Sequence, residues 1–174
     1  MPLWSMMIRR LPLLFYTVLN TILVSLWTLR KGIFHFNHSH NSLIVPNVKN
    51  VESKSIIEIA TELERLRECG RKKSFSSYDL QHGTITLSNI GNIGGTVLHP
   101  VIVSGQLCIG SIGRMQRIPR FEDVDGVEKV VAKEIMNVSF NADHRVIDGA
   151  TMARFVSAWK SYLENPGIML SKMR

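Results

Sequence analysis

The residues best suited to chemistry are His144 and Asp148, in the string His-Arg-Val-Ile-Asp-Gly that ends at Gly149. A run with β-strand alternation precedes the string and an amphipathic helix pattern follows it, which predicts a turn at a strand end. Histidine exchanges a proton readily near neutral pH, so one held there can act on a thiol or hydroxyl. Asp148 suits a helix cap or a contact with a cation, and Gly149 permits a tight turn. A histidine after a strand often only supports a loop, so the string alone leaves both interpretations open.

The elements that must position this string alternate between helices and strands. Helical spacing of apolar residues predicts helices at 55–69, 75–80 and 150–164. Alternating or β-branched runs predict strands at 43–45, 84–88, 101–103, 107–112 and 130–140, with a hairpin loop at 121–126. Ser55 is expected to cap the first helix and Gly70 to end it. Interleaved helices and strands favour an α/β fold, a two-layer sandwich with a mixed sheet.

Length, charge and cysteine content narrow the functional classes. A chain of 174 residues provides one domain with a substantial core rather than two. The net charge of +7 is uneven, because residues 1–51 hold five basic side chains and no acid. The rest is nearly balanced and has no basic stripe, which argues against nucleic-acid binding. Cys69 and Cys108 lack Cys-x-x-Cys spacing, which indicates reduced thiols and not a disulfide framework or a zinc site.

Residues 1–41 form a hydrophobic segment and linker that is expected to lie outside the folded part, residues 42–174. Residues 11–29 carry no charge, lie between basic pairs and are just long enough to span a bilayer. The alternatives are a membrane or targeting helix ahead of the fold, which would place the chain at a membrane, and a segment with no role in the fold. The histidines at 35–40 have no acid or cysteine beside them, so they indicate a solvated linker, and no metal site is predicted.

Four separate blocks connect the chain with a known family. They are residues 43–49 (LIVPNVK), 86–96 (TLSNIGNIGGT), 137–155 around the histidine, and 161–166 (SYLENP). In this order they resemble the catalytic domain of the dihydrolipoamide acyltransferase component of 2-oxoacid dehydrogenase complexes. The last block is most similar to the branched-chain 2-oxoacid member. The resemblance covers residues 42–174 and implies the C-terminal half of a chloramphenicol-acetyltransferase-like fold.

The resemblance implies that an acyl group moves between dihydrolipoamide and the thiol of coenzyme A. His144 would be the general base that removes the thiol proton, because the thiolate is the reactive nucleophile. Ser88 matches the family position whose hydroxyl stabilises the oxyanion, and one such donor contributes about 3 kcal/mol. Asp148 matches the acid of the motif and would organise the site through a basic partner rather than transfer protons. The resemblance does not identify the residues that bind coenzyme A.

Partners and a location also follow from the resemblance. Family members assemble as trimers with the active site between subunits, so the expected assembly is a homo-oligomer with a trimer-based core. Lipoamide would come from a lipoyl domain that this chain does not contain, and the other components of the dehydrogenase complex are further partners. The implied location is the mitochondrial matrix.

Two departures from the family leave other functions open. Residues 1–41 do not resemble the N-terminal half of the family's catalytic domain, and Gln106 and Cys108 stand where an acid and a small residue are usual. The second hypothesis is therefore a truncated, catalytically inactive remnant that acts only in interaction or assembly. The third is a membrane-anchored protein whose segment at 11–29 dominates its behaviour.

A hydrolase triad of Ser88, His144 and Asp148 is disfavoured. The serine lacks a Gly-x-Ser-x-Gly elbow, and Asp148 follows the histidine too closely to orient its ring from a separate element. A covalent acyl-serine in a trapping experiment would favour the triad over direct transfer.

Overall fold

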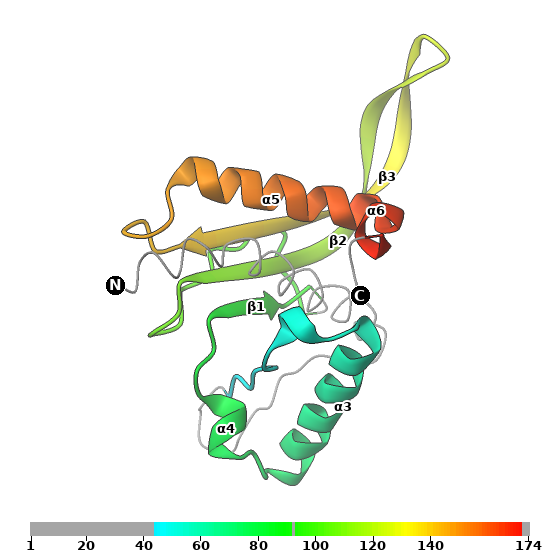
Figure 1. Cartoon of the computed structure of the whole chain (residues 1–174). Coiled ribbons are helices and arrows are strands. Elements are labelled where there is room, and N and C mark those ends of the chain that lie inside the picture. The colour runs from blue at the N-terminus through cyan, green and yellow to red at the C-terminus, as the bar shows by residue number, and fades with distance from the viewer. Residues whose placement is uncertain (1–43, 92, 172–174) are drawn as a thin grey trace. The chain divides into compact units, whose positions relative to one another are not determined.

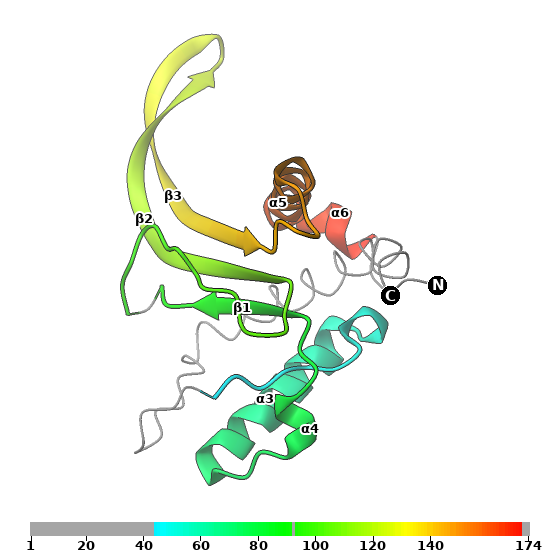
Figure 2. The same cartoon turned by 90° about the vertical axis from the view of Figure 1, so that its left-hand side faces the viewer.

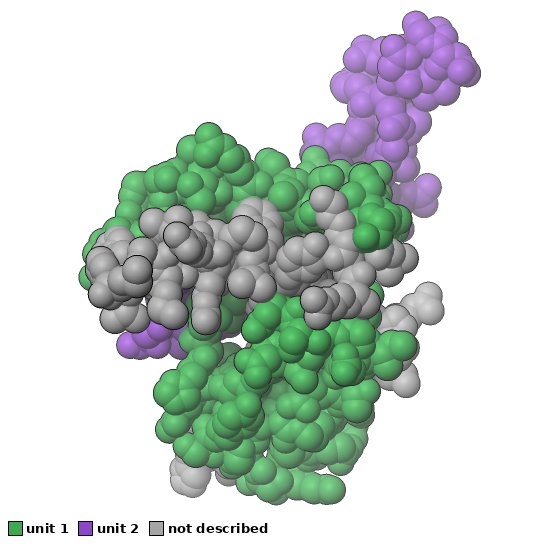
Figure 3. Space-filling view, viewed as in Figure 1, with its two compact units in different colours: residues 1–85, 144–174 green, residues 86–143 purple. Residues whose placement is uncertain are grey.

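The computed structural model describes residues 44–91 and 93–171 (Figure 1). In chain order its elements are η2 (Val51–Ser53), α3 (Ile56–Lys72), α4 (Ser77–Leu80), β1 (Ile85–Asn89), β2 (Cys108–Val124), β3 (Val127–Ala142), α5 (Gly149–Glu164) and α6 (Pro166–Leu170). They fall into two compact units, coloured separately in Figure 3. The first unit holds the described residues up to Ile85 and from His144 onward, and the second is Thr86–Asp143.

The N-terminal predictions fall on residues that the structure does not describe. The hydrophobic segment expected at 11–29 and the linker histidines at 35–40 both lie outside the described residues. Across residues 44–91 and 93–171, no helix is both long and apolar enough to cross a membrane.

A three-stranded sheet in the order β1-β2-β3 forms the second unit. β2 and β3 pair antiparallel from Cys108↔Ala142 to Val124↔Val127. The β1 arrow points the same way as its neighbour β2 (Figure 1 and Figure 2), so the sheet is mixed. The predicted α/β class with a mixed sheet is therefore confirmed.

The hairpin between β2 and β3 is much longer than predicted. The prediction of a loop at 121–126 is wrong, because residues 121–124 remain paired with 127–130. Only Asp125 and Gly126 form the turn, with φ values of 58° and 77°, the left-handed conformation that a two-residue hairpin turn requires. The Asp-Gly dipeptide is the sequence signal that identifies this turn.

The strand predicted at 101–103 is absent. Instead, the segment ends in a turn in which the Gln106 N–H donates to the Val103 carbonyl at 3.0 Å. Gly105 lies in this turn with a φ of 80°, a conformation that favours glycine. The β-branched residues Val-Ile-Val favour a strand locally, but this preference is overridden by the tertiary environment of the segment.

The helices of the first unit follow the predicted boundaries closely at their N-termini. Ser55 caps α3 and forms a capping box with Glu58, as predicted. The predicted end at Gly70 is wrong, because α3 continues to Lys72 and ends where Lys73 takes a left-handed φ of 54°.

α5 matches the helix predicted at 150–164 almost residue for residue. Phe155 and Trp159 are its buried residues, and both belong to the apolar side that the helical spacing predicts. Asn165 ends the helix. The short α6, which follows directly, was not predicted.

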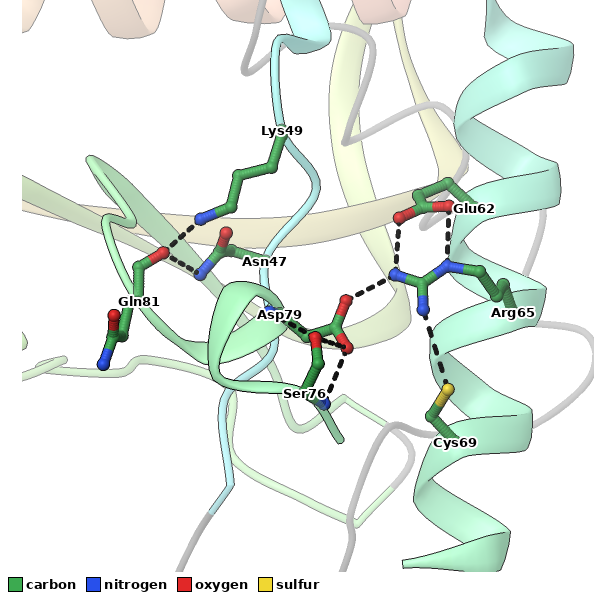
Figure 4. A network of polar contacts seen from close by, with 8 residues as sticks. All are labelled: Asn47, Lys49, Glu62, Arg65, Cys69, Ser76, Asp79 and Gln81. Atoms are coloured by element: carbon green, nitrogen blue, oxygen red, sulfur yellow. Dashed lines mark hydrogen bonds and ion pairs between the residues drawn. The ribbon is translucent and has the colours of Figure 1, made fainter. Parts of the chain in front are cut away.

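A polar network fixes α4 to α3 (Figure 4). Arg65 of α3 binds Glu62 at 2.7 Å and Asp79 of α4 at 2.5 Å. The Asp79 side chain is only 4% exposed and also forms a capping box with Ser76. Hydrogen bonds from Arg65 and Ser76 lower the pKa of Asp79 to about 2. The ionised carboxylate therefore joins two helices that are separate in the sequence.

Hydrogen bonds to α4 and to the residue after it also hold the chain that precedes η2. This part of the chain does not form the strand predicted at 43–45. The Asn47 N–H donates to the Asp79 carbonyl at 2.8 Å, and its side-chain amide donates to the Gln81 carbonyl at 3.1 Å (Figure 4). Residues 44 and 45 have no regular structure, and residue 43 lies outside the described residues. The predicted strand is therefore wrong for the part of it that is described.

Asp79→Asn should lower the free energy of unfolding by about 1–2 kcal/mol at pH 7. The expected loss is this small because Arg65 is partly exposed, so solvent weakens its attraction to Asp79. The asparagine retains a capping oxygen but loses the charge that binds Arg65. Since the pKa of Asp79 is lowered, the wild-type advantage is complete above about pH 4 and disappears as the pH falls towards 2. Urea unfolding from pH 2 to 7 measures this.

Glu64→Gln is the matched control, because Glu64 is half-exposed in its pair with Arg67. Its effect on unfolding should be close to zero. An Asp79→Asn penalty that is equal at pH 2 and pH 7 would contradict the proposed ion pair.

Candidate active site

Ser88 lies on β1 and shares a face of that strand with Thr86, because side chains two residues apart point to the same side. The Ser88 side chain is half-buried. The Thr86 hydroxyl donates to the Gln106 side-chain oxygen at 2.5 Å. Gln106 stands where the family usually has an acid. Through this bond it supports the strand that carries Ser88.

The glycine-rich turn after Ser88 lies directly against β2. The Arg114 N–H donates to the Gly95 carbonyl at 2.8 Å. A Cβ on Gly113 would lie 2.7 Å from the Thr96 carbonyl oxygen, and a Cβ on Gly91 would lie 2.7 Å from the Gly113 oxygen. Glycine is therefore needed here so that two backbones can approach each other.

Cys108 begins β2 and is fully buried. Burial raises the pKa of its thiol to about 11, so the nucleophilic thiolate is strongly disfavoured at neutral pH. Cys69 is only half-buried, and its sulfur accepts a hydrogen bond from Arg65 at 3.6 Å. Both cysteines are free, as predicted.

His144 follows β3 in a turn, at the strand end predicted from the sequence. The turn begins where the Asp143 N–H donates to the Leu107 carbonyl at 2.9 Å. Ile147, three residues later, is buried and anchors the turn, whereas the His144 side chain is exposed. An imidazole in this position is fixed at its backbone and accessible to a thiol.

Asp148 is the N-cap of α5. One carboxylate oxygen accepts from the Thr151 N–H at 2.8 Å, and the other accepts from the Thr151 hydroxyl at 2.9 Å. These bonds lower the pKa of Asp148, and the charge of Arg154 lowers it further. The carboxylate is therefore ionised at neutral pH and cannot supply a proton. The alternative of a helix cap, left open by the sequence, is what the structure shows.

The structure joins His144 and Asp148 through one turn and assigns Ser88 to the other unit. Sequence reasoning did not find the supporting contacts of Gln106 and Gly113, which are not local. It also missed that Asn141, near the end of β3, donates its amide to the Pro100 carbonyl. The cap itself had a visible signal, because Thr151 stands three residues after an aspartate at the start of a helix pattern.

A family model described as the catalytic domain of the 2-oxoacid dehydrogenases acyltransferase matches residues 37–171. The chain belongs to this family. Among its relatives is the mitochondrial lipoamide acyltransferase component of the branched-chain alpha-keto acid dehydrogenase complex of Caenorhabditis elegans, 54% identical over 132 residues. The Bos taurus protein of the same name is 53% identical over 136 residues. These alignments cover 76% and 78% of this chain but only 29% and 28% of the relatives.

Solved structures of the family agree with the fold. The dihydrolipoamide acetyltransferase of Azotobacter vinelandii superposes with a TM-score of 0.66 at 30% identity, covering 75% of this chain and 52% of that one. The cubic core of the pyruvate dehydrogenase multienzyme complex gives the same TM-score, identity and coverage. The chain thus spans about half of these solved chains and less than a third of the curated relatives it matches.

Asp148→Ala should lower the melting temperature by a few degrees, because the Thr151 N–H and hydroxyl lose their acceptor. Asp148→Asn, which keeps an acceptor oxygen, should retain most of the stability. Because the pKa of Asp148 is lowered, its charge-dependent contribution is present near neutral pH and is lost on acidification. Thermal melts of both variants at neutral and acidic pH test the cap, and equal losses in both would contradict it.

Gly113→Ala should destabilise the second unit by about 1–3 kcal/mol, because the new methyl group would overlap the Thr96 carbonyl oxygen. Gly94→Ala is the control in the same turn, since no atom lies within 4 Å of a Cβ built there. Chemical denaturation compares the two. A Gly113→Ala variant as stable as Gly94→Ala would show that the backbone approach is not needed.

Proposed function

We propose that the chain supplies the catalytic turn of a lipoamide acyltransferase that moves an acyl group between dihydrolipoamide and coenzyme A. The observation that carries the proposal is the exposed His144 on a turn braced by β3 and by the Asp148 cap. The branched-chain type is supported by relatives at 53–54% identity, compared with 34% for the pyruvate dehydrogenase acetyltransferase of Rickettsia felis.

The spacing of the three candidate residues supports their roles. The Azotobacter vinelandii structure belongs to a study of a serine, a histidine and an asparagine in the catalytic mechanism of that enzyme, with the histidine and asparagine four residues apart. His144 and Asp148 are also four residues apart, so Asp148 has the same spacing from its histidine as that asparagine. The serine precedes the histidine by 52 residues there, and Ser88 precedes His144 by 56 residues here.

In the proposed mechanism His144 acts as the general base. Its exposed ring accepts the proton of the coenzyme A thiol, and the resulting thiolate attacks the thioester carbonyl. When the tetrahedral intermediate collapses, the carbon–sulfur bond to dihydrolipoamide breaks and the imidazolium returns the proton to the departing sulfur. The atoms of the exchange therefore balance without an outside acid or base.

Ser88 is proposed to stabilise the oxyanion of that intermediate. Within the described part of the chain its hydroxyl makes no hydrogen bond, so its proton is available to a substrate oxygen. The strand position is fixed by the Thr86–Gln106 bond, which limits the reorganisation needed to reach the transition state. As the resemblance implies, Ser88 and His144 of neighbouring protomers would face each other across a subunit boundary.

Asp148 is proposed to position His144 rather than to react. Its carboxylate accepts hydrogen bonds in the first turn of α5, and the positive charge of Arg154 in the same helix attracts it. This agrees with the expected role of organising the site through a basic partner. A rigid helix start limits how far the preceding turn, and therefore the imidazole, can move.

The relatives in Caenorhabditis elegans, Bos taurus and Mus musculus are mitochondrial proteins. We propose the mitochondrial matrix for this chain, in a homo-oligomer with a trimer-based core. Lipoamide would be presented by a lipoyl domain, and the other components of the dehydrogenase complex would be partners. The division into residues 1–41 and 42–174 stays a prediction.

His144→Ala should lower the rate of acyl transfer from acyl-dihydrolipoamide to coenzyme A by about 10²–10⁴-fold, because it removes the general base. Ser88→Ala should lower kcat by about 10²–10³-fold with little change in KM, because the oxyanion forms only in the transition state. The measurement is steady-state turnover with isobutyryl and acetyl donors, and a preference for the branched donor is expected.

His99→Ala is the matched control, since His99 is an exposed histidine that has no proposed role. Its turnover should equal that of the wild type. Equal turnover of His144→Ala and His99→Ala would overturn the proposal, and a folded oligomer with no turnover at all would favour the assembly hypothesis. An acyl-serine adduct at Ser88 would favour a hydrolase mechanism.

A further inference from the structure

The connection between α3 and α4 places a serine directly after a cluster of positive charge. Arg71, Lys72 and Lys73 are consecutive, and nowhere else in the sequence do three basic residues follow one another. Ser74 comes next, and residues 74–76 have no regular structure. All four of these residues are exposed. Charge patterns of this kind are a means by which protein kinases select their substrates, so the serine invites a search for features of a phosphorylation site.

The Ser74 hydroxyl differs from those of the two serines that follow it. Within the described part of the chain the Ser74 side chain makes no hydrogen bond. The Ser76 hydroxyl, in contrast, donates to the Asp79 carboxylate at 2.7 Å and accepts from the Asp79 N–H at 3.2 Å, so its modification would break the capping box of α4. Ser77 lies inside α4 and four residues beyond the last cation. Ser74 is therefore the serine of this segment whose oxygen is both free and next to the charge.

The cations ahead of Ser74 are available to a binding partner. Among the described residues Lys72 and Lys73 form no ion pair. Arg71 pairs with Glu68, but both side chains are about half exposed, and an ion pair of this kind contributes little to stability. An enzyme with carboxylates in its substrate cleft could therefore engage all three cations at little cost to the fold of this chain.

The backbone of this segment can also open. An enzyme that binds residues 71–75 as an extended peptide must unwind the last turn of α3. Lys73 ends that helix with a left-handed φ of 54°, a conformation that is unfavourable for a residue with a Cβ, so unwinding releases this strain. Helix ends open more readily than helix interiors. The Arg65–Asp79 pair lies outside the turn that opens, because Arg65 is six residues before Arg71.

We propose that Ser74 is a phosphorylation site for a serine kinase that selects basic residues ahead of its target. The Ser74 oxygen attacks the γ-phosphorus of ATP, the bond from that phosphorus to the β,γ-bridging oxygen breaks, and ADP departs. The hydroxyl proton passes to an aspartate of the kinase. Since the phosphoserine carries a charge of nearly −2 at neutral pH, the net charge of residues 71–74 falls from +3 to about +1. The inference does not depend on acyl transfer.

Phosphorylation of the full 174-residue chain tests the proposal. The chain is incubated with ATP and a purified serine kinase that requires arginine or lysine ahead of its target, and intact mass and peptide mapping locate the phosphate. One phosphate per chain is expected, at Ser74. Ser74→Ala should abolish the labelling. Ser77→Ala is the matched control, because it removes another exposed serine of the same segment, and it should be labelled at the wild-type rate.

A second pair of variants tests the role of the charges. Lys72→Gln with Lys73→Gln should lower the initial rate of labelling by about tenfold or more, because the kinase loses two electrostatic contacts. Lys129→Gln with Lys160→Gln removes two exposed lysines elsewhere and should leave the rate unchanged. Circular dichroism verifies that all variants fold.

A synthetic peptide of residues 68–79 measures the rate at which the same kinase labels this sequence without a fold. The folded chain should be labelled at a rate within about tenfold of the peptide, because the turn around Lys73 opens easily. Labelling of the peptide alone would overturn the proposal. A phosphate at Ser76 or Ser77 in place of Ser74, or a rate that does not depend on Lys72 and Lys73, would overturn it as well.

Discussion

The antiparallel ladder between β2 and β3 is the interaction on which the sheet that carries Ser88 depends. Inside the second unit Gly110 pairs with Phe140 across this ladder, and a Cβ on Gly110 would overlap the Phe140 ring. A slip of one residue would send every side chain to the other face of the ribbon. His144 follows the last ladder pair by two residues and is the first residue of the other unit after the sheet.

At the start of α5, Asp148 can have both a structural role as helix cap and an electrostatic role near His144. Its carboxylate accepts hydrogen bonds from the N–H and the hydroxyl of Thr151 and so caps the helix. The same carboxylate remains ionised because those donors stabilise its charge, so it provides a fixed negative potential near the turn that carries His144. A cap in this place stabilises the helix and also restricts the turn that carries His144.

Local signals predicted the local parts of the structure. The capping box of Ser55, the extent of α5 and the strand-end position of His144 all depend on residues close together in the sequence, and all were correct. Contacts across long separations were not accessible. The Thr86–Gln106 bond, the approach of Gly113 to Thr96 and the Arg65–Asp79 pair join segments whose proximity is decided by the tertiary fold. The strand expected at 101–103 failed for the same reason, because β-branched residues need a paired neighbour.

The errors in the prediction of the hairpin have a different cause. Residues 113–129 do not show the alternation of a strand with one buried face, because charged and apolar residues occur on both faces of the β2–β3 hairpin. Alternation of apolar and polar residues arises where one face of a strand is buried, and here Phe121, Val127 and Val130 all remain exposed. Without a buried face the strands have no periodicity to detect, so the Asp-Gly turn signal is the local feature from which the hairpin could have been predicted.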